Sequence, residues 1–364
     1  MRELVIAGRR IADDTPMYVV AEIGHNHNGS VELAKQLIVA AKIAGADAVK
    51  FQYRCVDDIY TEELKQRPMV GENAFAPTYG EHRKILEFSR QSLWETCLEA
   101  KTCGLACIVT VFGFAAAERV ARYNIVDAFK IASGDLTHTP LLECVAKRSM
   151  EHVAGLCKPL IVSTGGATLA DVVRAYDTIM PINQQLAFLQ CTTCYPTKYH
   201  EMNLRVIETY REAFPECVIG LSSHTDTGAM ALPAYILGAR IIEKHFTLNH
   251  DMKGTDHGFA LDPQQFAKMT RDLRRLSVAL GDSVKRPYPS EREPTKLRAK
   301  SLVAARDIAA GTKLTREDIA IKAPGDGIPP YELEAVIGLE APYLLKKDDK
   351  IPRFLAEYKT WGGT

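Results

Sequence analysis

The chain has 364 residues, which is long for one compact domain and suits a large domain followed by a small one. Its 45 basic residues balance its 45 acidic residues and no basic block occurs, so non-specific binding to nucleic acid or to an anionic membrane has no electrostatic driving force. No apolar run has the length of a membrane span or a signal peptide, and the nine cysteines are scattered and mostly in apolar surroundings, so we expect a cytoplasmic protein with reduced thiols.

A regular alternation of strand and helix dominates the first three quarters of the chain. Residues 1–16 are expected to form a short hairpin or cap. The β-prone runs that follow, each succeeded by a segment of helical spacing, cover residues 17–23, 46–52, 106–112, 126–131, 159–163, 186–191, 217–222 and 240–246. Eight such units within about 250 residues predict an α/β protein with a (β/α)8 TIM barrel, because an open doubly wound sheet would not require eight.

Two segments depart from this alternation of strand and helix. Residues 53–80, between the second strand and its helix, are long and contain Pro and Gly, which is typical of a loop over a site. The barrel domain is predicted to span residues 1–285, and a Pro-rich, charged linker follows at 286–299. Residues 300–364 are expected to form a small, mostly β module, because short β-runs there are separated by Gly and Pro.

Polar side chains follow nearly every predicted strand, at the end of the barrel where active sites of this fold lie. They are Glu22, Lys50, Gln52, Thr110, Lys130, Ser133, Asp135, Ser163, Thr193, Tyr195, Ser222, His224, Glu243 and His245, with Asp256 shortly after. Two imidazoles on neighbouring strands, His224 and His245, with carboxylates nearby, are what a divalent metal site needs.

The two lysines at these strand ends require an anion, because an unpaired buried ammonium is costly. Hydroxyls at positions 110, 133, 163 and 222 and the glycine-rich turn after Ser163 add donors suited to phosphate oxygens. The pattern therefore predicts an acidic, phosphate-bearing substrate that faces a cation able to polarise a carbonyl. A purely structural alternative is that Lys50 and Lys130 form barrel ion pairs with Glu22 or Asp135.

Seven motifs carry a resemblance to a known family, in order and over nearly the whole chain. They are Ala21-Glu-Ile-Gly-His-Asn-His-Asn-Gly29, Ala46-Asp-Ala-Val-Lys-Phe-Gln52, Phe129-Lys-Ile-Ala-Ser-Gly-Asp135, Ile161-Val-Ser-Thr-Gly165, Cys191-Thr-Thr-Cys-Tyr-Pro-Thr197, Gly220-Leu-Ser-Ser-His224 and Glu243-Lys-His-Phe-Thr247. The chain resembles the sialic acid synthase family, which condenses phosphoenolpyruvate with a sugar, and its C-terminal module is similar to their antifreeze-like (SAF) domain.

The resemblance implies a transferase that joins phosphoenolpyruvate to an N-acylated mannosamine-type aldose and releases phosphate by C–O cleavage. It implies that phosphoenolpyruvate lies on Lys50, Lys130, Thr110, Ser133, Ser163 and Ser222. It also implies that His224 and His245 hold Mn²⁺ or Mg²⁺. Glu22 would position or deprotonate the attacking water. The residues expected to form hydrogen bonds with the sugar hydroxyls are Gln52, Asp135, Tyr195 and Asp256. The active form of this family is a domain-swapped homodimer in which the SAF module caps the partner's barrel.

The chain departs from the family pattern at three places. An arginine that contacts the sugar from the SAF module is missing, because the corresponding segment here is Lys322-Ala-Pro-Gly325. Thr193 stands where the family has Asn, and Ser223 where it often has an acidic residue. Asn73, in the long loop, could compensate for the missing arginine.

Several functional alternatives remain at the level of sequence. The resemblance implies an N-acetylneuraminate synthase, or a legionaminate or pseudaminate synthase of the same family; the acceptor could be N-acetylmannosamine, its 6-phosphate or a diacetamido sugar. His25-Asn-His27 is similar to the His-x-His of metal-dependent amidohydrolase barrels. The amidohydrolase mechanism, however, requires histidines after strands five and six, where this chain has Ser163 and Cys191. A non-catalytic carbohydrate-binding protein would not need two lysines and a metal site.

Overall fold

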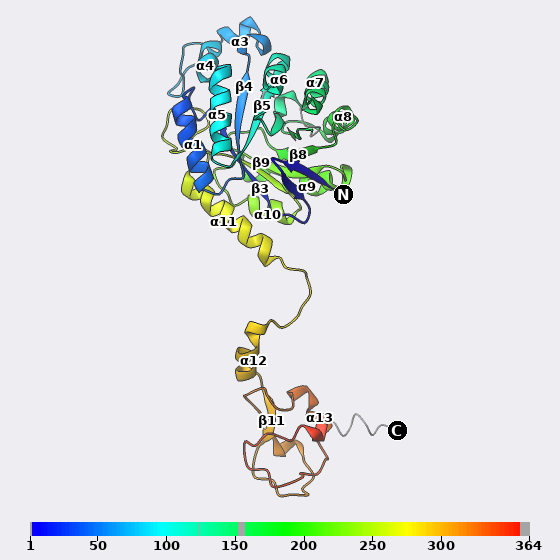
Figure 1. Ribbon diagram of the computed structural model, residues 1–364. Coiled ribbons are helices and arrows are strands. Elements are labelled where there is room, and N and C mark those ends of the chain that lie inside the picture. Colours follow the sequence, from blue (N-terminus) through cyan, green and yellow to red (C-terminus); the bar gives the residue numbers. More distant parts are fainter. Residues whose placement is uncertain (1, 123, 152–156, 357–364) are drawn as a thin grey trace. The chain divides into compact units, whose positions relative to one another are not determined.

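A computed structural model describes residues 2–122, 124–151 and 157–356 of the chain (Figure 1). The chain divides into two compact units, Met1–Gly281 and Asp282–Thr364. The last residues of the predicted C-terminal module, 357–364, lie outside the described residues.

The first unit is a closed barrel of eight parallel strands in the order β10-β3-β4-β5-β6-β7-β8-β9. The strands are β3 (Tyr18–Gly24), β4 (Ala48–Arg54), β5 (Ala106–Phe112), β6 (Ala128–Ile131), β7 (Leu160–Ser163), β8 (Leu186–Cys191), β9 (Val218–Ser223) and β10 (Ile241–His245). The prediction of a (β/α)8 barrel is therefore confirmed. The largest difference in a strand end is at β4, which continues two residues beyond its predicted last residue, Gln52, and thereby adds Arg54 to the barrel mouth.

Helices cover the outside of the barrel. They are α1 (Val31–Ile43), α5 (Arg90–Thr102), α6 (Gly113–Ala121), α7 (Thr139–Met150), α8 (Leu169–Ile179), α9 (Val206–Ala213), α10 (Ala231–Ile236) and α11 (Pro263–Ala279). Several begin at a side-chain cap: Ser30 Oγ accepts from Leu33 N at 3.2 Å, and Asp262 from Gln265 N at 2.8 Å. Their apolar faces pack on the outward residues of the strands, such as Phe51 of β4, because successive strand residues point to opposite faces.

Strands β1 (Glu3–Ile6) and β2 (Arg9–Ala12) pair antiparallel and form the hairpin expected near the N-terminus. Its Leu4, Ile6 and Ile11 belong to the same apolar cluster as inward-facing residues of the strands. That cluster also includes Tyr18, Val20, Ala48, Ala106, Ile108, Ala128, Ile161, Ala187, Leu189, Val218 and Ile241. The hairpin therefore packs against the start of the strands, and the lower part of the barrel is apolar.

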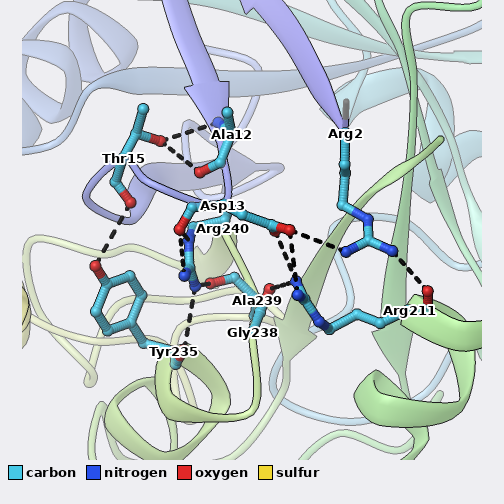
Figure 2. Close-up of polar contacts among 9 residues, drawn as sticks. All are labelled: Arg2, Ala12, Asp13, Thr15, Arg211, Tyr235, Gly238, Ala239 and Arg240. Atoms are coloured by element: carbon cyan, nitrogen blue, oxygen red, sulfur yellow. Dashed lines mark hydrogen bonds and ion pairs between the residues drawn. The ribbon is translucent and has the colours of Figure 1, made fainter. Parts of the chain in front are cut away.

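Polar contacts around Asp13 hold this hairpin in place (Figure 2). The Asp13 carboxylate accepts from Arg2 Nη1 at 3.1 Å and from Arg211 Nη1 at 2.7 Å. Its backbone carbonyl accepts from Arg240 Nη2 at 2.6 Å. Because Arg211 lies in α9 and Arg240 directly precedes β10, the hairpin is tied to elements more than 190 residues away along the chain.

The long segment after β4 is not a structureless loop. It contains α2 (Val56–Ile59), α3 (Glu62–Gln66) and α4 (Tyr79–Leu86), with Thr61 and Thr78 as caps. These short helices matter for function because α4 supplies residues to the mouth of the barrel.

The second unit is small and has its own apolar core, which includes Leu302, Ile308, Leu314 and Ile319. Its regular elements are α12 (Arg292–Arg298), β11 (Ser301–Ala304), β12 (Ile319–Lys322) and α13 (Leu333–Val336), with short 3₁₀ turns between them. Strands β11 and β12 pair antiparallel. Within the predicted linker, 286–299, the structure forms helix α12.

Candidate active site

A cavity of about 450 Å³ opens at the C-terminal ends of the barrel strands, and all eight strands contribute to it. Its lining includes Glu22, Lys50, Gln52, Thr110, Lys130, Ser133, Ser163, Thr193, Tyr195, Ser222, His224, Glu243 and His245. The structure thus brings together thirteen of the residues that were predicted at the strand ends. They gather because parallel strands of a barrel end on the same face.

Two buried lysines lie in this cavity, and carboxylates hold both. Lys50 Nζ lies 2.8 Å from Glu22 Oε2 and 3.6 Å from Glu243 Oε1. Lys130 Nζ lies 4.0 Å from Glu243 Oε2. The expected pair of Lys50 with Glu22 is present, whereas the carboxylate beside Lys130 is Glu243 rather than Asp135.

Burial and mutual attraction set the charges of this group. Burial tends to raise the pKa of Glu243, but Lys130 and Lys50 outweigh it and lower that pKa to about 2. Burial raises the pKa of Glu22, against the attraction of Lys50. Burial also lowers the pKa of Lys130, whereas in Lys50 the nearby Glu22 and Glu243 outweigh burial and raise it. Glu243 is therefore a fixed anion, and Glu22 is the carboxylate able to exchange a proton.

Hydroxyl groups surround the lysine pair. Lys50 Nζ donates to Thr110 Oγ1 at 2.9 Å and Lys130 Nζ to Ser163 Oγ at 2.5 Å. Ser222 Oγ donates to Glu243 Oε1 at 3.1 Å, and Ser133 Oγ accepts from Gly165 N at 3.0 Å. These groups offer donors and acceptors to an incoming anion.

Gly165 makes the close approach of three elements possible. A Cβ at this position would lie 2.1 Å from Thr193 Oγ1 and 2.9 Å from Ser133 Oγ. Any larger residue would therefore force the hydroxyl groups of Thr193 and Ser133 to move away from this turn. The turn after Ser163 thus contributes to the site by its lack of a side chain.

The residues present fit a two-histidine metal site. Each imidazole is 5% exposed, and the ring centroids of His224 and His245 lie 5.3 Å apart. His224 Nδ1 lies 2.9 Å from the Thr192 carbonyl, so that nitrogen carries the proton and Nε2 keeps its lone pair. His245 Nδ1 is buried without a hydrogen-bond partner, 3.6 Å from Asp256 Oδ2. Burial lowers the pKa of His224 to about 4 and that of His245 to about 3, so both rings are neutral at pH 7.

Across the described residues, no three His, Cys, Asp or Glu side chains are grouped closely enough to hold a metal ion. Any cation between His224 and His245 would complete its coordination with water or substrate.

Two lining residues, Arg54 and Arg83, were not predicted from the sequence. Glu243 was expected at the end of its strand, but its pairing with the two lysines was not. Period-two alternation, counted from Lys50 and Gln52, points to Arg54. No local sequence pattern indicates that Arg83, which lies in α4, lines the cavity.

Four predicted substrate-binding residues lie outside the cavity lining. Asn73 accepts a hydrogen bond from Gly254 N at 3.0 Å, and Asp256 lies beside His245. Asp135, whose Oδ2 is buried without a partner, has its pKa raised by burial. Lys322 belongs to the second unit, where it forms an ion pair with Asp348.

The His-x-His segment after β3 does not join the histidine pair. His27 stacks on Phe88 with ring centroids 3.7 Å apart. His25 Nε2 lies 2.9 Å from Glu87 Oε1. Both therefore support the wall of the mouth rather than an amidohydrolase-type metal centre.

The comparisons with known proteins place this barrel and its polar mouth in a class of synthases of carbohydrate biosynthesis, which act on small molecules. The NeuB family model matches residues 37–285 and the SAF domain model matches residues 299–352. The chain belongs to the NeuB family of sialic acid and nonulosonate synthases.

Relatives with different products are about equally similar. The N-acetylneuraminate-9-phosphate synthase of Mus musculus is 33% identical over 345 residues, which cover 94% of this chain and 94% of that protein. The N,N'-diacetyllegionaminic acid synthase of Campylobacter jejuni is 34% identical over 337 residues, covering 92% of this chain and 98% of that protein. The crystal structure of the spore coat polysaccharide biosynthesis protein spsE of Bacillus subtilis superposes with a TM-score of 0.64 at 31% identity, covering 96% and 97%. No helix among the described residues is long and apolar enough to cross a membrane.

Proposed function

We propose that the protein condenses phosphoenolpyruvate with the open-chain aldehyde of an N-acylated mannosamine-type aldose and releases phosphate. The observation that carries this proposal is the arrangement of Lys50 and Lys130 around Glu243, within one cavity that also holds His224 and His245. The cations and hydroxyls suit a phosphorylated acid, and the imidazoles suit a cation that polarises an aldehyde. The relatives named above supply the sugar class.

The lysine group would hold the donor. The ammonium groups of Lys50 and Lys130 compensate the charges of phosphoenolpyruvate, and the hydroxyls of Thr110, Ser163 and Ser222 can donate to its oxygens. The glycine turn at Gly165 keeps this part of the wall close to Ser133. The donor is thereby oriented with its C3 carbon toward the histidine pair.

The acceptor would lie with its aldehyde at His224 and His245. Mn²⁺ or Mg²⁺ held by their free nitrogens would polarise the aldehyde oxygen. C3 of the donor then attacks the aldehyde carbon, the aldehyde oxygen takes up a proton from solvent, and positive charge develops at C2 of the donor. Gln52, whose Nε2 donates to Glu22 Oε1 at 2.8 Å, lies where it can meet a sugar hydroxyl.

Glu22 would complete the reaction. Its raised pKa makes it able to accept a proton from the water that attacks C2. The tetrahedral intermediate then loses phosphate by cleavage of the C2–O bond. The C2 hydroxyl gives up its proton to solvent as the ketone forms, and Glu22 returns its own proton to the departing phosphate oxygen.

The test is an assay of the full chain with phosphoenolpyruvate, Mn²⁺ and an N-acylmannosamine in ¹⁸O-labelled water. We expect phosphate release that depends on the sugar, a product with the mass of a nonulosonic acid, and no label in the phosphate. Labelled phosphate would mean P–O cleavage and would contradict the mechanism. His245→Ala should lose Mn²⁺ binding and activity while keeping its far-ultraviolet circular dichroism; turnover in that variant would exclude the metal assignment.

We also propose a cytoplasmic, domain-swapped homodimer in which the second unit of one chain completes the site of the other. Sedimentation of the full chain should give twice the chain mass. Deletion of residues 296–364 should cost activity, whereas full activity in a truncated monomer would rule this arrangement out.

A further inference from the structure

Arg54, at the end of β4, lines the cavity but takes no direct part in the proposed condensation. Its charge is already compensated, because its Nη1 donates to Glu87 Oε1 at 3.0 Å and its backbone N–H donates to Glu87 Oε2 at 3.0 Å. The guanidinium also lies 3.7 Å from the centroid of the Phe112 ring, and its side chain is only 8% exposed. Arg54 is therefore a firmly held, ion-paired group that requires no further anion.

The other terminal nitrogen of Arg54 is connected to the carboxylate of Glu22 through one side chain. Arg54 Nη2 donates to Gln52 Oε1 at 2.6 Å, and Gln52 Nε2 donates to Glu22 Oε1 at 2.8 Å. Gln52 can reach both because residues two apart on β4 point to the same face, and because Glu22 lies on the neighbouring strand β3. A continuous chain of hydrogen bonds thus joins the guanidinium to the carboxylate.

The guanidinium end fixes the direction of this chain. A guanidinium has only donors, so the atom of the Gln52 amide that faces Arg54 must be the carbonyl oxygen. The amide nitrogen then faces Glu22 and donates to it. The reversed amide would set a carbonyl oxygen against the carboxylate and a donor against a donor, and both contacts cost free energy in a buried site. Within the described residues, no other group donates to Gln52 Oε1.

This orientation has two consequences at the site. The Glu22 carboxylate is held at both oxygens, because Oε1 accepts from Gln52 and Oε2 lies 2.8 Å from Lys50 Nζ. One N–H of the Gln52 amide remains uncommitted and can point into the cavity. A sugar hydroxyl that reaches Gln52 therefore meets a hydrogen-bond donor rather than an acceptor.

We propose that Arg54 is a positioning residue for the condensation. It sets the direction of the Gln52 amide, which in turn holds the Glu22 carboxylate and presents a donor to the sugar. The inference rests on the proposed function, because Glu22 acts there as the base. Arg54 works through the Gln52 amide and not through its charge, which Glu87 offsets, so its kinetic effect depends on that amide being present.

A double-mutant cycle in the full chain tests this dependence. It compares the wild type, Arg54→Leu, Gln52→Met and the double variant, with phosphoenolpyruvate, Mn²⁺ and N-acetylmannosamine. We expect Arg54→Leu to lower kcat by about tenfold and to raise the KM of the sugar, because a freely turning amide holds Glu22 less well. The KM of phosphoenolpyruvate should not change, since the lysines that would hold it are untouched. In the Gln52→Met background, Arg54→Leu should lower kcat no further.

Two more variants separate positioning from folding. Arg54→Lys keeps the charge beside Glu87 and a donor for Gln52 Oε1, so it should recover part of the lost kcat. Arg274→Leu is the matched control, because it removes a guanidinium that lies 2.7 Å from Asp47, at the start of β4 and thus at the other end of the barrel. It should lower the urea midpoint and leave kcat and both KM values unchanged.

The orientation of the amide can also be measured without turnover. A neutron structure of the perdeuterated protein should show both deuterons of the Gln52 amide on the atom nearer Glu22. Deuterons on the atom nearer Arg54, or an equal loss of kcat from Arg54→Leu in both backgrounds, would overturn the positioning role and leave the condensation intact. Absence of phosphate release by the wild type with any N-acylmannosamine would refute the proposed function itself.

Discussion

Glu243 is the carboxylate that both buried lysines share. It is 5% exposed, and its two oxygens face Lys50 and Lys130 separately. Before substrate binds, Glu243 is the carboxylate that offsets the charge of Lys130, and it shares Lys50 with Glu22. Glu243 thus keeps the lysines charged and ready for an anionic donor.

We predict that Glu243→Gln destabilises the protein by roughly 3 kcal/mol, because removal of one member of a buried ionic group leaves the others uncompensated. Phosphoenolpyruvate should raise the urea midpoint of this variant more than that of the wild type, since its phosphate replaces the lost charge. Glu208→Gln, which removes a carboxylate paired with Arg205 at the surface, is the control and should change neither quantity. An equal response to phosphoenolpyruvate in all three proteins would contradict the proposed donor site.

At the scale of elements, Lys244 joins the ends of β9 and β10. It alternates with Glu243 and His245, so its side chain points away from the cavity, and it is 1% exposed. Its Nζ donates to the Ser223 carbonyl at 3.2 Å and also to the Thr225 carbonyl. These two carbonyls flank His224, so Lys244 fixes the backbone that carries one of the imidazoles.

We therefore expect Lys244→Met to weaken Mn²⁺ binding by about tenfold, as loss of a group that orients a metal ligand typically does. Electron paramagnetic resonance of free Mn²⁺ measures this without reference to turnover. Burial lowers the pKa of Lys244 to about 7, so the Met variant need not be less stable. Lys244→Arg, which can still donate to both carbonyls, should bind Mn²⁺ normally. Wild-type affinity in the Met variant would refute the positioning role.

For the first unit as a whole, the barrel has an apolar lower half and a polar upper half. The N-terminal hairpin packs into the apolar cluster, and the contacts of Asp13 keep it there. The polar residues that face inward are confined to the ends of the strands, where the cavity opens. This division places several ionisable groups in buried surroundings, and the stability of the protein depends on pH as a result.

Acid should destabilise the fold through histidines that are buried in the neutral form. Burial lowers the pKa of His27 and His245 to about 3 and that of His224 and His257 to about 4, from 6.5. Between pH 6.5 and 4 the unfolded chain binds protons at these rings and the folded protein does not, so the free energy of unfolding falls as pH falls. Each ring contributes roughly 1.4 kcal/mol per pH unit at most.

Urea unfolding of the metal-free protein at pH 7, 6 and 5 tests this expectation. His27→Phe, which keeps an aromatic ring against Phe88, should reduce the pH dependence by about one proton. A free energy of unfolding that is constant from pH 7 to 5 would contradict the assignment of neutral rings.

Much of this architecture followed from local sequence patterns. The eight-fold alternation of strand and helix predicted the barrel, and strand-end positions predicted thirteen of the cavity residues, because strand direction and period-two alternation are local properties. A short hairpin or cap was expected over residues 1–16, and the structure has the hairpin.

The pairing of the charged residues could not be predicted from the sequence. Closure of the barrel puts β10 beside β3 and brings Glu243 to Lys50, more than 190 residues apart in sequence. The short helix α4 folds back over the mouth and delivers Arg83, which no strand pattern could place. The physical reason is that pairing of charges depends on distances through space, which strand register and barrel closure set, whereas the pattern of residues along the chain sets only the elements themselves.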